Sequence, residues 1–485
     1  MKILLLTPYT GGNLGDAAIQ EAAIAGIRKR LPNVDLLLVT LSPDDTSRVH
    51  GVPSFPIGVT TFGPGIPVGD EAASSGGDQT QNTIDARRRV TADRILRALR
   101  ERAARAGRVI MYWTGILEIG HIIRAFMATR SASMLIVSGG GQLDDYWGGP
   151  FRQPYALLKW ALIARASGAR VVFLSVGTCS LSRLSRALVR VALSLASYRS
   201  FRDEGSKSLA SFAPCTAHDE VQPDLAFSYE VPATVRTEGT RRRDVVLGVS
   251  PIAYLSRIWP ETNQVVYTRY LQSLASTIKD AAAHGHQILV FTSDPVDWAA
   301  VSDLNALVRS AVGNLSARQV VIRETFTLEG FFAQIAECDL FVASRLHGVL
   351  LANLVSTPTL AISYDRKVDA YMHEMELTKF CVDIRSVSHT VLMSRLGELA
   401  AEAEAVRSHL SEVVRVNRRR LEAQYDHILA DLRPRRSRRA ASVHANPHLG
   451  YEQSVDEGAP SANTGLEPSP LWDAKPYRHT NGGDK

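Results

Sequence analysis

The 485-residue sequence contains little cysteine, and no two cysteines form a CxxC motif. Of its four cysteines, only Cys215 has a histidine close by in the sequence, His218. A structural zinc site usually needs two such ligand pairs. We therefore expect reduced thiols and no bound metal. No sequence motif indicates a cofactor.

Long apolar segments are also missing. No run of about 18 uninterrupted apolar residues occurs, so the sequence predicts no membrane-spanning helix. The segment from Met1 to Thr7 reads as a strand with one lysine, without the apolar core and small-residue cleavage site of a secretory signal. These features favour a cytoplasmic protein.

The composition is that of a globular protein, with 45% hydrophobic and 21% charged residues. A single core rarely exceeds roughly 250 to 300 residues, so this length favours two domains. The net charge of +6 is modest, and four arginines are clustered near the carboxyl end. They are Arg435, Arg436, Arg438 and Arg439.

Short apolar runs alternate with helical patterns of 10 to 15 residues along most of the chain, which predicts parallel sheets with helical crossovers. The expected fold is α/β, with two Rossmann-like domains, a helical extension and a disordered tail. A loop-like, partly mobile insertion is expected near residues 42–85, which are rich in Pro, Gly, Ser and Asp. The predicted parts are residues 1–233, 244–385, 386–432 and 433–485.

Residues 13–16, NLGD, follow the first predicted strand and open a helix. Ligands of parallel sheets bind beyond the carboxyl ends of strands, where a helix amino terminus offers free N–H groups. Asp16 therefore has two interpretations: it caps the helix, or it binds sugar hydroxyls together with Asn13. The spacing does not fit a GxGxxG dinucleotide motif.

Residues 138–145, SGGGQLDD, also follow a predicted strand. Gly140 and Gly141 permit a close backbone approach to a ligand, and Asp144 adds a carboxylate that suits hydroxyl groups. The alternative is a tight strand-to-helix turn. Arg202 leaves a similar choice open: it contacts a phosphate or carboxylate, or it belongs to an exposed helix start.

The most specific motif is SRLHG at residues 344–348, which comes directly after a buried strand. It places a permanent cation, Arg345, and a titratable imidazole, His347, at the ligand-binding edge of the second sheet. Residues 364–368, YDRKV, follow the next strand and add Lys367. Several cations at one edge indicate a small, highly charged anion.

Together, NLGD, the glycine run, RDEGS at residues 202–206, SRLHG and YDRKV resemble the polysaccharide pyruvyl transferase family, over roughly residues 2–377. The resemblance implies a GT-B-like pair of Rossmann domains, phosphoenolpyruvate as donor and co-substrate, and a polysaccharide or lipid-linked saccharide as acceptor. The Arg-Leu-His element carries over onto Arg345, Leu346 and His347 as the donor site. This sequence departs from the family at residues 175–180, SVGTCS, where a glycine-proline turn is often found.

Ketal formation needs fixed cations and a group that moves protons. Arg345 is the first choice for binding the donor, followed by Lys367 and Arg202. His347 is the expected acid and base, and either Asp16 or Asp144 assists the acceptor hydroxyls.

Two other functions stay open. A glycosyltransferase that uses a nucleotide sugar would share the fold, and so would a saccharide-binding relative without activity. The arginines near the carboxyl end lack the aromatic interleaving of a nucleic-acid site, so no nucleic-acid partner is expected. They suit a peripheral contact with anionic lipid at the inner face of a membrane.

Overall fold

The computed structural model describes residues 1–7, 9, 12–59, 115–145, 148–178, 181–213, 219–232, 245–257, 259, 261–311 and 319–432. By contacts the chain divides into two compact units. The first unit contains residues 1–11 and 33–222, and the second contains residues 12–32 and 223–485. The helix that follows the first strand therefore belongs to the second unit. The four predicted sequence ranges stay a prediction.

The first unit is built on a parallel sheet, sheet A, whose described strands run in the order β3-β2-β1-β4-β6-β7-β8, with β5 paired to β6. The chain moves outward from β1 to β3 on one side and from β4 to β8 on the other. The strands are β1 (Lys2–Leu6), β2 (Asp35–Thr40), β3 (Ser54–Pro56), β4 (Ala132–Val137), β5 (Gly140–Leu143), β6 (Arg170–Thr178), β7 (Tyr198–Phe201) and β8 (Asp219–Val221).

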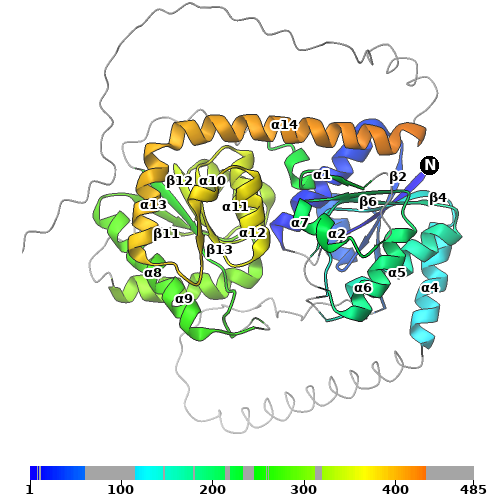
Figure 1. The fold of residues 1–485 in the computed structure, drawn as a ribbon, viewed down its shortest axis with the longest axis horizontal. Coiled ribbons are helices and arrows are strands. Elements are labelled where there is room, and N and C mark those ends of the chain that lie inside the picture. Colours follow the sequence, from blue (N-terminus) through cyan, green and yellow to red (C-terminus); the bar gives the residue numbers. More distant parts are fainter. Residues whose placement is uncertain are drawn as a thin grey trace, which may run out of the picture. The chain divides into compact units, whose positions relative to one another are not determined.

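Helices α4, α5 and α6 lie side by side in this unit (Figure 1). Their inner residues share one apolar core with side chains of β1, β2, β4, β6 and β7. Trp160 of α5 lies at its centre and donates its indole N–H to the carbonyl of Ile57 at 2.9 Å. The helices of the first unit are α2 (Pro43–His50), α4 (Ile116–Thr129), α5 (Gln153–Ala166), α6 (Arg183–Ser194) and α7 (Glu204–Leu209).

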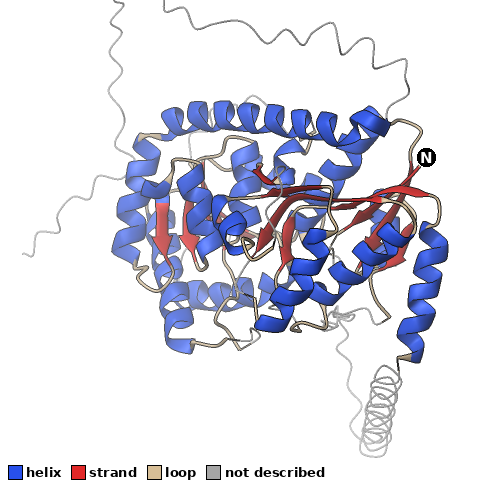
Figure 2. Cartoon of the chain, turned by 45° about the vertical axis from the view of Figure 1, so that its right-hand side comes forward, coloured by secondary structure: helices blue, strands red, loops and turns tan. Residues whose placement is uncertain are grey.

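The second unit contains sheet B, with the strand order β11-β10-β9-β12-β13-β14. Every strand pair described in the two sheets is parallel, as predicted. In Figure 2 helices flank the strands of each sheet. The strands are β9 (Val246–Ser250), β10 (Gln287–Val290), β11 (Val320–Ile322), β12 (Leu340–Ala343), β13 (Thr359–Ser363) and β14 (Cys381–Asp383).

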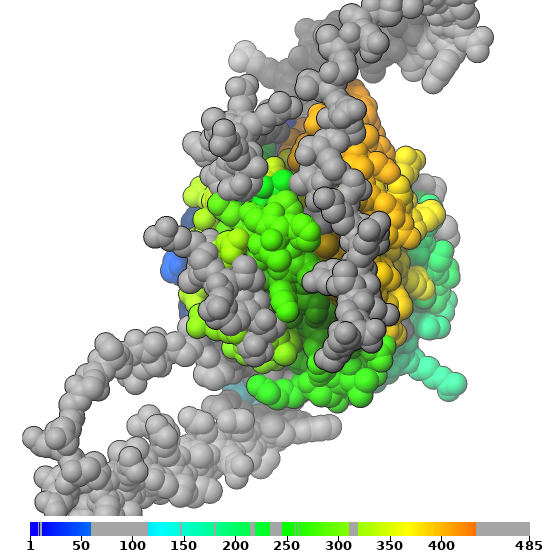
Figure 3. Space-filling model, turned by 90° about the vertical axis from the view of Figure 1, so that its left-hand side faces the viewer, coloured from blue at the N-terminus to red at the C-terminus, as the bar shows by residue number. Residues whose placement is uncertain are grey.

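Most helices of the second unit begin at a side chain that caps the first turn, such as Asn13 of α1, Asn263 of α8 and Asp365 of α12. Figure 3 shows the side of this unit where green residues of α8 and α9 and orange residues of α13 lie close together. The α-helices are α1 (Leu14–Arg30), α8 (Gln264–Ala283), α9 (Trp298–Ala311), α10 (Leu328–Ala336), α11 (Leu346–Leu354), α12 (Arg366–Glu374), α13 (His389–Ala401) and α14 (Ala403–Leu429). The 3-10 helices are η1 (Leu225–Ser228), η3 (Pro295–Asp297), η4 (Thr378–Phe380) and η5 (Ala430–Leu432).

Helix α14 holds α1 in this unit through ion pairs and a cation–ring contact. Arg30, near the end of α1, bonds Glu422 at 2.7 Å and Asp426 at 2.9 Å, and its guanidinium lies over the ring of Tyr425. Arg418 donates to the backbone carbonyls of η1 and of the residue that follows it. These contacts hold α1 and η1, which both reach the site described below.

Two sequence predictions need correction. Residues 42–59 belong to the predicted loop-like insertion, yet they form α2 and β3, because Pro43 starts a helix that Gly51 ends with a φ of 60°. The tight strand-to-helix turn considered for residues 138–145 is also not found, because residues 140–143 form β5 and pair with β6. The remainder of the insertion, residues 60–85, and the tail, residues 433–485, lie outside the described residues.

Candidate functional site

The candidate site lies in the second unit, at the carboxyl edge of sheet B. The chain runs from β9 outward to β11 on one side and from β12 to β14 on the other, so the strand order reverses between β9 and β12. Ligands of open parallel sheets bind at such a reversal. Arg345 is separated from the end of β12 by Ser344 and is the residue before α11; its backbone angles are extended, and its side chain makes no capping bond to that helix.

Two aspartates hold the guanidinium of Arg345. Its Nε and Nη2 donate to the carboxylate of Asp297, and its Nη1 lies 3.2 Å from Oδ2 of Asp294. Burial opposes the charged guanidinium, but the two carboxylates outweigh it and raise the pKa of Arg345. Arg345 is therefore a fixed cation whose charge is already balanced by its neighbours.

Asp297 is fully buried and also accepts the backbone N–H of Ala253 at 2.9 Å. Burial raises the pKa of Asp297 to about 6, although Arg345 acts in the opposite direction. Asp294 has a second partner as well, because the side-chain amide of Asn13 donates to its Oδ2 at 2.8 Å. Through this bond the first turn of α1 is connected to Arg345.

His347 follows in the first turn of α11. Its ring packs directly on the backbone of Gly15 in α1, where an added Cβ would lie 2.3 Å from Cγ and Nδ1 of the ring. Its Nε2 lies 3.7 Å from Oδ2 of Asp224, a carboxylate that is 2% exposed and whose other oxygen accepts the N–H of Ala226. The imidazole is thus held between α1 and a buried acid.

Asp16 lies in the same cluster. Burial raises the pKa of Asp16; His347 and Arg345 oppose this effect, whereas Asp294 and Asp224 add to it. Asp16 does not cap α1, because the capping oxygen belongs to Asn13, which accepts the backbone N–H of Asp16 at 3.1 Å. Of the predicted site residues, Asn13, Asp16, Arg345 and His347 are therefore brought together.

An aromatic group borders Arg345. Trp259 lies under its guanidinium, 5.5 Å from Cζ to the ring centroid, and Tyr254 joins Trp259 to Tyr364. The predicted donor residue Lys367 lies in the first turn of α12, with its ammonium 5.1 Å from the ring centroid of Tyr364. These residues follow β9 and β13, so they share the carboxyl edge with Arg345.

The other predicted residues belong to the first unit. Gly140 and Gly141 open β5, and a Cβ on Gly141 would lie 3.1 Å from Oδ2 of Asp144. Arg202 is largely buried: its Nε lies 3.6 Å from Asp203, and its Nη2 packs against Gly177. Asp203 caps α7, so this segment is the helix start that the sequence left open, with an arginine turned inward.

Sequence reasoning did not find Asp224, Asp294 and Asp297. Asp294 and Asp297 come shortly after β10, at the edge where ligands of parallel sheets bind, and this position was an available signal. Asp224 lies between the short strand β8 and η1, and the sequence analysis predicted no strand there. Its approach to His347 depends on the tertiary structure.

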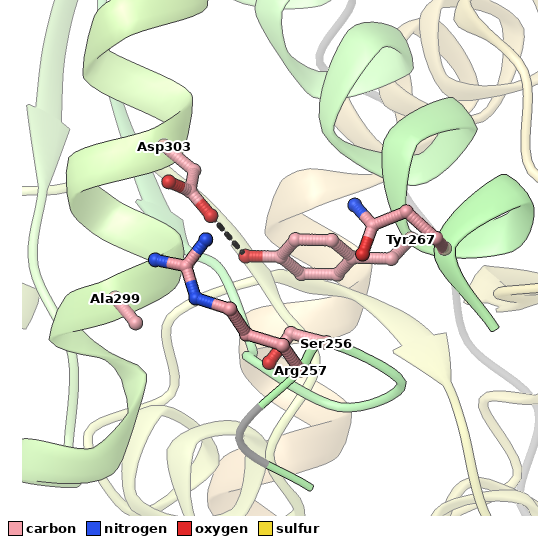
Figure 4. Close-up of a pocket in the computed structure, with 6 residues that line it drawn as sticks. Ser256, Arg257, Tyr267, Ala299 and Asp303 are labelled. Carbon is pink, nitrogen blue, oxygen red and sulfur yellow. Dashed lines mark hydrogen bonds between the residues drawn. The ribbon is translucent and has the colours of Figure 1, made fainter. Parts of the chain in front are cut away.

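A small pocket lies beside this edge in the second unit. Ser256, Tyr267 and Asp303 line it, and the hydroxyl of Tyr267 donates to Asp303 at 3.0 Å (Figure 4). Burial raises the pKa of Tyr267, and the bond to Asp303 adds to the effect. Arg257 points toward the same carboxylate in Figure 4, which gives the pocket a polar wall.

Within the described ranges, no three His, Cys, Asp or Glu side chains are grouped so that they would hold a metal ion. The carboxylates around Arg345 instead bind a guanidinium and backbone N–H groups. No helix in the same ranges combines the length and the apolar character needed to cross a membrane.

Solved structures of several sugar-nucleotide enzymes share the fold. A UDP-GlcNAc 2-epimerase from Methanocaldococcus jannaschii matches with a TM-score of 0.51 at 12% identity, covering 82% of this chain and 93% of that one. HepE of Anabaena, solved in complex with UDP, matches with a TM-score of 0.52 at 12% identity, covering 89% and 99%. These matches confirm the predicted α/β fold class.

A family model described as polysaccharide pyruvyl transferase matches residues 13–366. The matched range begins at Asn13 and includes every residue of the cluster around Arg345 and His347. It covers most of the chain, so this protein belongs to the polysaccharide pyruvyl transferase family.

Proposed function

We propose that this protein transfers pyruvate from phosphoenolpyruvate to two hydroxyls of a sugar, forming a ketal and releasing phosphate. The acceptor is a polysaccharide or a lipid-linked saccharide. The observation that carries the proposal is the imidazole of His347, held between Gly15 and Asp224 beside the fixed cation Arg345. Family membership supports the same reaction.

The reaction needs one proton donor, and this donor regains its proton in the course of the reaction. A proton added to the methylene carbon of phosphoenolpyruvate gives a methyl group and an oxocarbenium-like carbon. One sugar oxygen bonds to that carbon and loses its proton, which restores the donor. Phosphate then leaves with the electrons of its C–O bond, and the second hydroxyl forms the second C–O bond and passes its proton to the departing phosphate.

His347 is the group we propose for the first proton and for its recovery from the hydroxyl. We propose that the carboxylate of Asp224, 3.7 Å from Nε2 of His347, orients the ring. Asp16 has a raised pKa because it is buried. Asp16 lies in the same cluster as His347 and Arg345, so we assign its carboxyl group to the hydroxyls of the acceptor.

Arg345 has five N–H donors, and its contacts with Asp294 and Asp297 leave a second N–H on each terminal nitrogen for the donor. Its charge is balanced, so we propose that Lys367 and the amino terminus of α11, at Leu346, supply the remaining positive potential. Arg202 is the proposed further contact. Gly140, Gly141 and Asp144 stay proposed acceptor residues, with Asn13 alongside Asp16.

The test is phosphate release from phosphoenolpyruvate with a panel of galactosyl, mannosyl, glucosyl and aminosugar acceptors, followed by mass spectrometry. The expected result is acceptor-dependent phosphate and a matching pyruvyl mass gain. His347→Ala removes the proton-transfer group, which typically contributes about 10²- to 10⁴-fold. Arg345→Ala removes the fixed donor contact and should abolish turnover as well.

Two exposed residues provide matched controls: His373→Ala at the end of α12 and Arg309→Ala near the end of α9. Both should keep wild-type turnover. A folded wild-type protein that releases no phosphate with any acceptor would contradict the proposal. Full activity in His347→Ala would remove this residue from the mechanism.

The same assay tests a second candidate function. The balanced charge of Arg345 and the aromatic group of Tyr254, Trp259 and Tyr364 also suit a nucleotide sugar, whose base stacks on aromatic rings. HepE of Anabaena, which shares the fold, was solved with UDP. Transfer of a sugar from a UDP-sugar, without use of phosphoenolpyruvate, would favour a glycosyltransferase. Tight saccharide binding without either turnover would favour a binding protein.

The proposed location is the cytoplasm, with contact at the inner face of a membrane. The arginines of residues 433–439 are one source of such contact, at roughly 1 kcal/mol for each basic residue near anionic lipid. Deleting the residues after Leu432 tests this role of the tail, because a contributing tail makes salt-sensitive vesicle binding weaker when it is removed.

A further inference from the structure

Helix α4 has apolar residues on both of its faces. Ala125 and His121 are fully buried on the face that packs against the core of the first unit. On the opposite face four large apolar side chains are each at least 58% exposed. These are Ile116, Ile119, Ile123 and Met127.

The spacing of these four residues places them in one stripe, because steps of three and four residues return to the same side of a helix. Single exposed apolar residues are common on soluble proteins, but a continuous stripe marks an interaction site. Soluble helices normally carry polar residues on the outer face. The outer face of α4 therefore requires a partner that accepts apolar side chains.

The neighbouring helices extend this surface. α4 contacts α5, and α5 contacts α6, so the three helices form one layer (Figures 1 and 2). Their inner sides share a single core, which leaves their outer sides on a common surface. That surface adds three more exposed apolar side chains. They are Leu162 of α5 and Leu184 and Val191 of α6.

All the exposed charges of this layer are positive. The three helices contain one acid, Glu118, whose side chain is only 13% exposed and is bonded to Lys159 at 2.8 Å. The exposed charged residues within α4, α5 and α6 are all arginines. They are Arg124, Arg165, Arg183, Arg186 and Arg190.

We infer that the outer surface of α4, α5 and α6 binds the surface of an anionic lipid bilayer. The apolar stripe of α4 enters the boundary between headgroups and acyl chains, and the arginines contact the phosphates. Apolar side chains combined with basic residues on a helix are typical of helices that lie in a membrane interface. This inference does not depend on the proposed reaction.

Charge argues against two other occupants. A second copy of the chain would bring an equally basic face against this one. The chain's own residues 87–108 precede α4 and contain nine arginines against Asp93 and Glu101, so they would also bring like charge. An anionic bilayer satisfies both the apolar stripe and the arginines.

The experiment measures cosedimentation of the full-length protein with phosphatidylcholine vesicles, with and without phosphatidylglycerol, in low and high salt. Binding should require phosphatidylglycerol and weaken in high salt, because exposed charges are screened. Ile119→Asp combined with Ile123→Asp should reduce binding strongly, to the level that the tail alone supports. Arg183→Gln and Arg190→Gln should each weaken partitioning about fivefold.

Val265→Asp, at a residue of α8 that is 69% exposed, is the matched control for the apolar substitutions, and Lys279→Gln is the control for the arginines. Both should bind like wild type. Unchanged thermal unfolding would show that the α4 variants are folded. Wild-type binding by the α4 and arginine variants would overturn the inference, and so would concentration-dependent dimerisation that the α4 variants abolish.

A chain that ends at Leu432 separates this surface from the tail. If α4, α5 and α6 bind lipid, the shortened chain still cosediments with anionic vesicles and loses that binding when Ile119 and Ile123 are substituted. Complete loss on deletion alone would assign the binding to the tail and overturn the inference. Because no step needs substrate, a negative activity assay leaves this result interpretable.

Discussion

Both units are built on a parallel sheet, but the acidic side chains of the two units have different surroundings. In the first unit, bonds from Ser185 and Ser182 outweigh burial and lower the pKa of Asp145. In the second unit, burial raises the pKa of Asp16 and of Asp297. Asp145 acts as a local hydrogen-bond acceptor, whereas Asp16 and Asp297 lie in the cluster around Arg345 and His347.

The strand reversals differ in the same way. In sheet A the reversal lies between β1 and β4, where Ser138 donates its side-chain hydroxyl to the carbonyl of Leu6 at 3.1 Å. In sheet B the corresponding position carries Arg345 and His347. Both sheets therefore have a strand reversal of the kind at which ligands bind. The side chains at that edge decide which of the two carries reactive groups.

The largest expected effect comes from removing one partner of a buried ion pair in each unit. Asp297→Asn leaves Arg345 partly unpaired, and Asp219→Asn does the same to Arg199, which is 1% exposed and bonds Asp219 at 2.6 Å. Each should cost about 3–5 kcal/mol of unfolding free energy, measured with urea. Only Asp297→Asn should also reduce phosphate release per folded molecule. Equal loss of activity in both variants would break the comparison.

A smaller effect is expected at the contact between α1 and α11. Gly15→Ala places a methyl group against the ring of His347, so the ring must move and turnover should fall by about a hundredfold. Gly120→Ala is the control in α4, where a Cβ meets no atom within 4 Å. That variant should retain activity and gain about 0.5–1 kcal/mol of stability. Normal turnover in Gly15→Ala would show that the ring position is not critical.

The smallest effects concern pH. Burial raises the pKa of Glu21 to about 7, and Glu329 adds to it, so the folded second unit favours the protonated acid. The resulting stability is present below the ordinary value of 4.5 and is lost as pH rises through 7. Glu21→Gln should therefore unfold at a higher temperature than wild type at about pH 8, and this gain should vanish below pH 4.5.

His50 of the first unit has the opposite sign. Burial lowers the pKa of His50 to about 4, so its contribution is present above 6.5 and is lost as pH falls toward 4. Thermal unfolding of His50→Gln should therefore differ from wild type most in acid.

A Glu21→Gln profile parallel to wild type at every pH would show that the carboxyl group of Glu21 is not buried in the folded protein.

The sequence alone determined the parallel α/β architecture, because buried strands alternate with helices along the chain, and it located Arg345 and His347, because they follow a strand directly. It did not separate capping from binding at the first turn of α1. Asn13 takes the cap there, and the structure leaves Asp16 beside His347. Local patterns cannot decide between two adjacent polar residues that both suit a helix start.

Only the tertiary structure grouped α1 with the C-terminal sheet, and only it brought Asp224 and Asp294 to His347 and Arg345. Asp224 and His347 are 123 residues apart in the chain, and no periodicity connects them. The exposed apolar face of α4 could not be predicted either. An apolar helix is normally buried, and only its packing shows which face is exposed. Sequence patterns report which residues suit a strand or helix, whereas contacts between distant segments depend on how those elements pack.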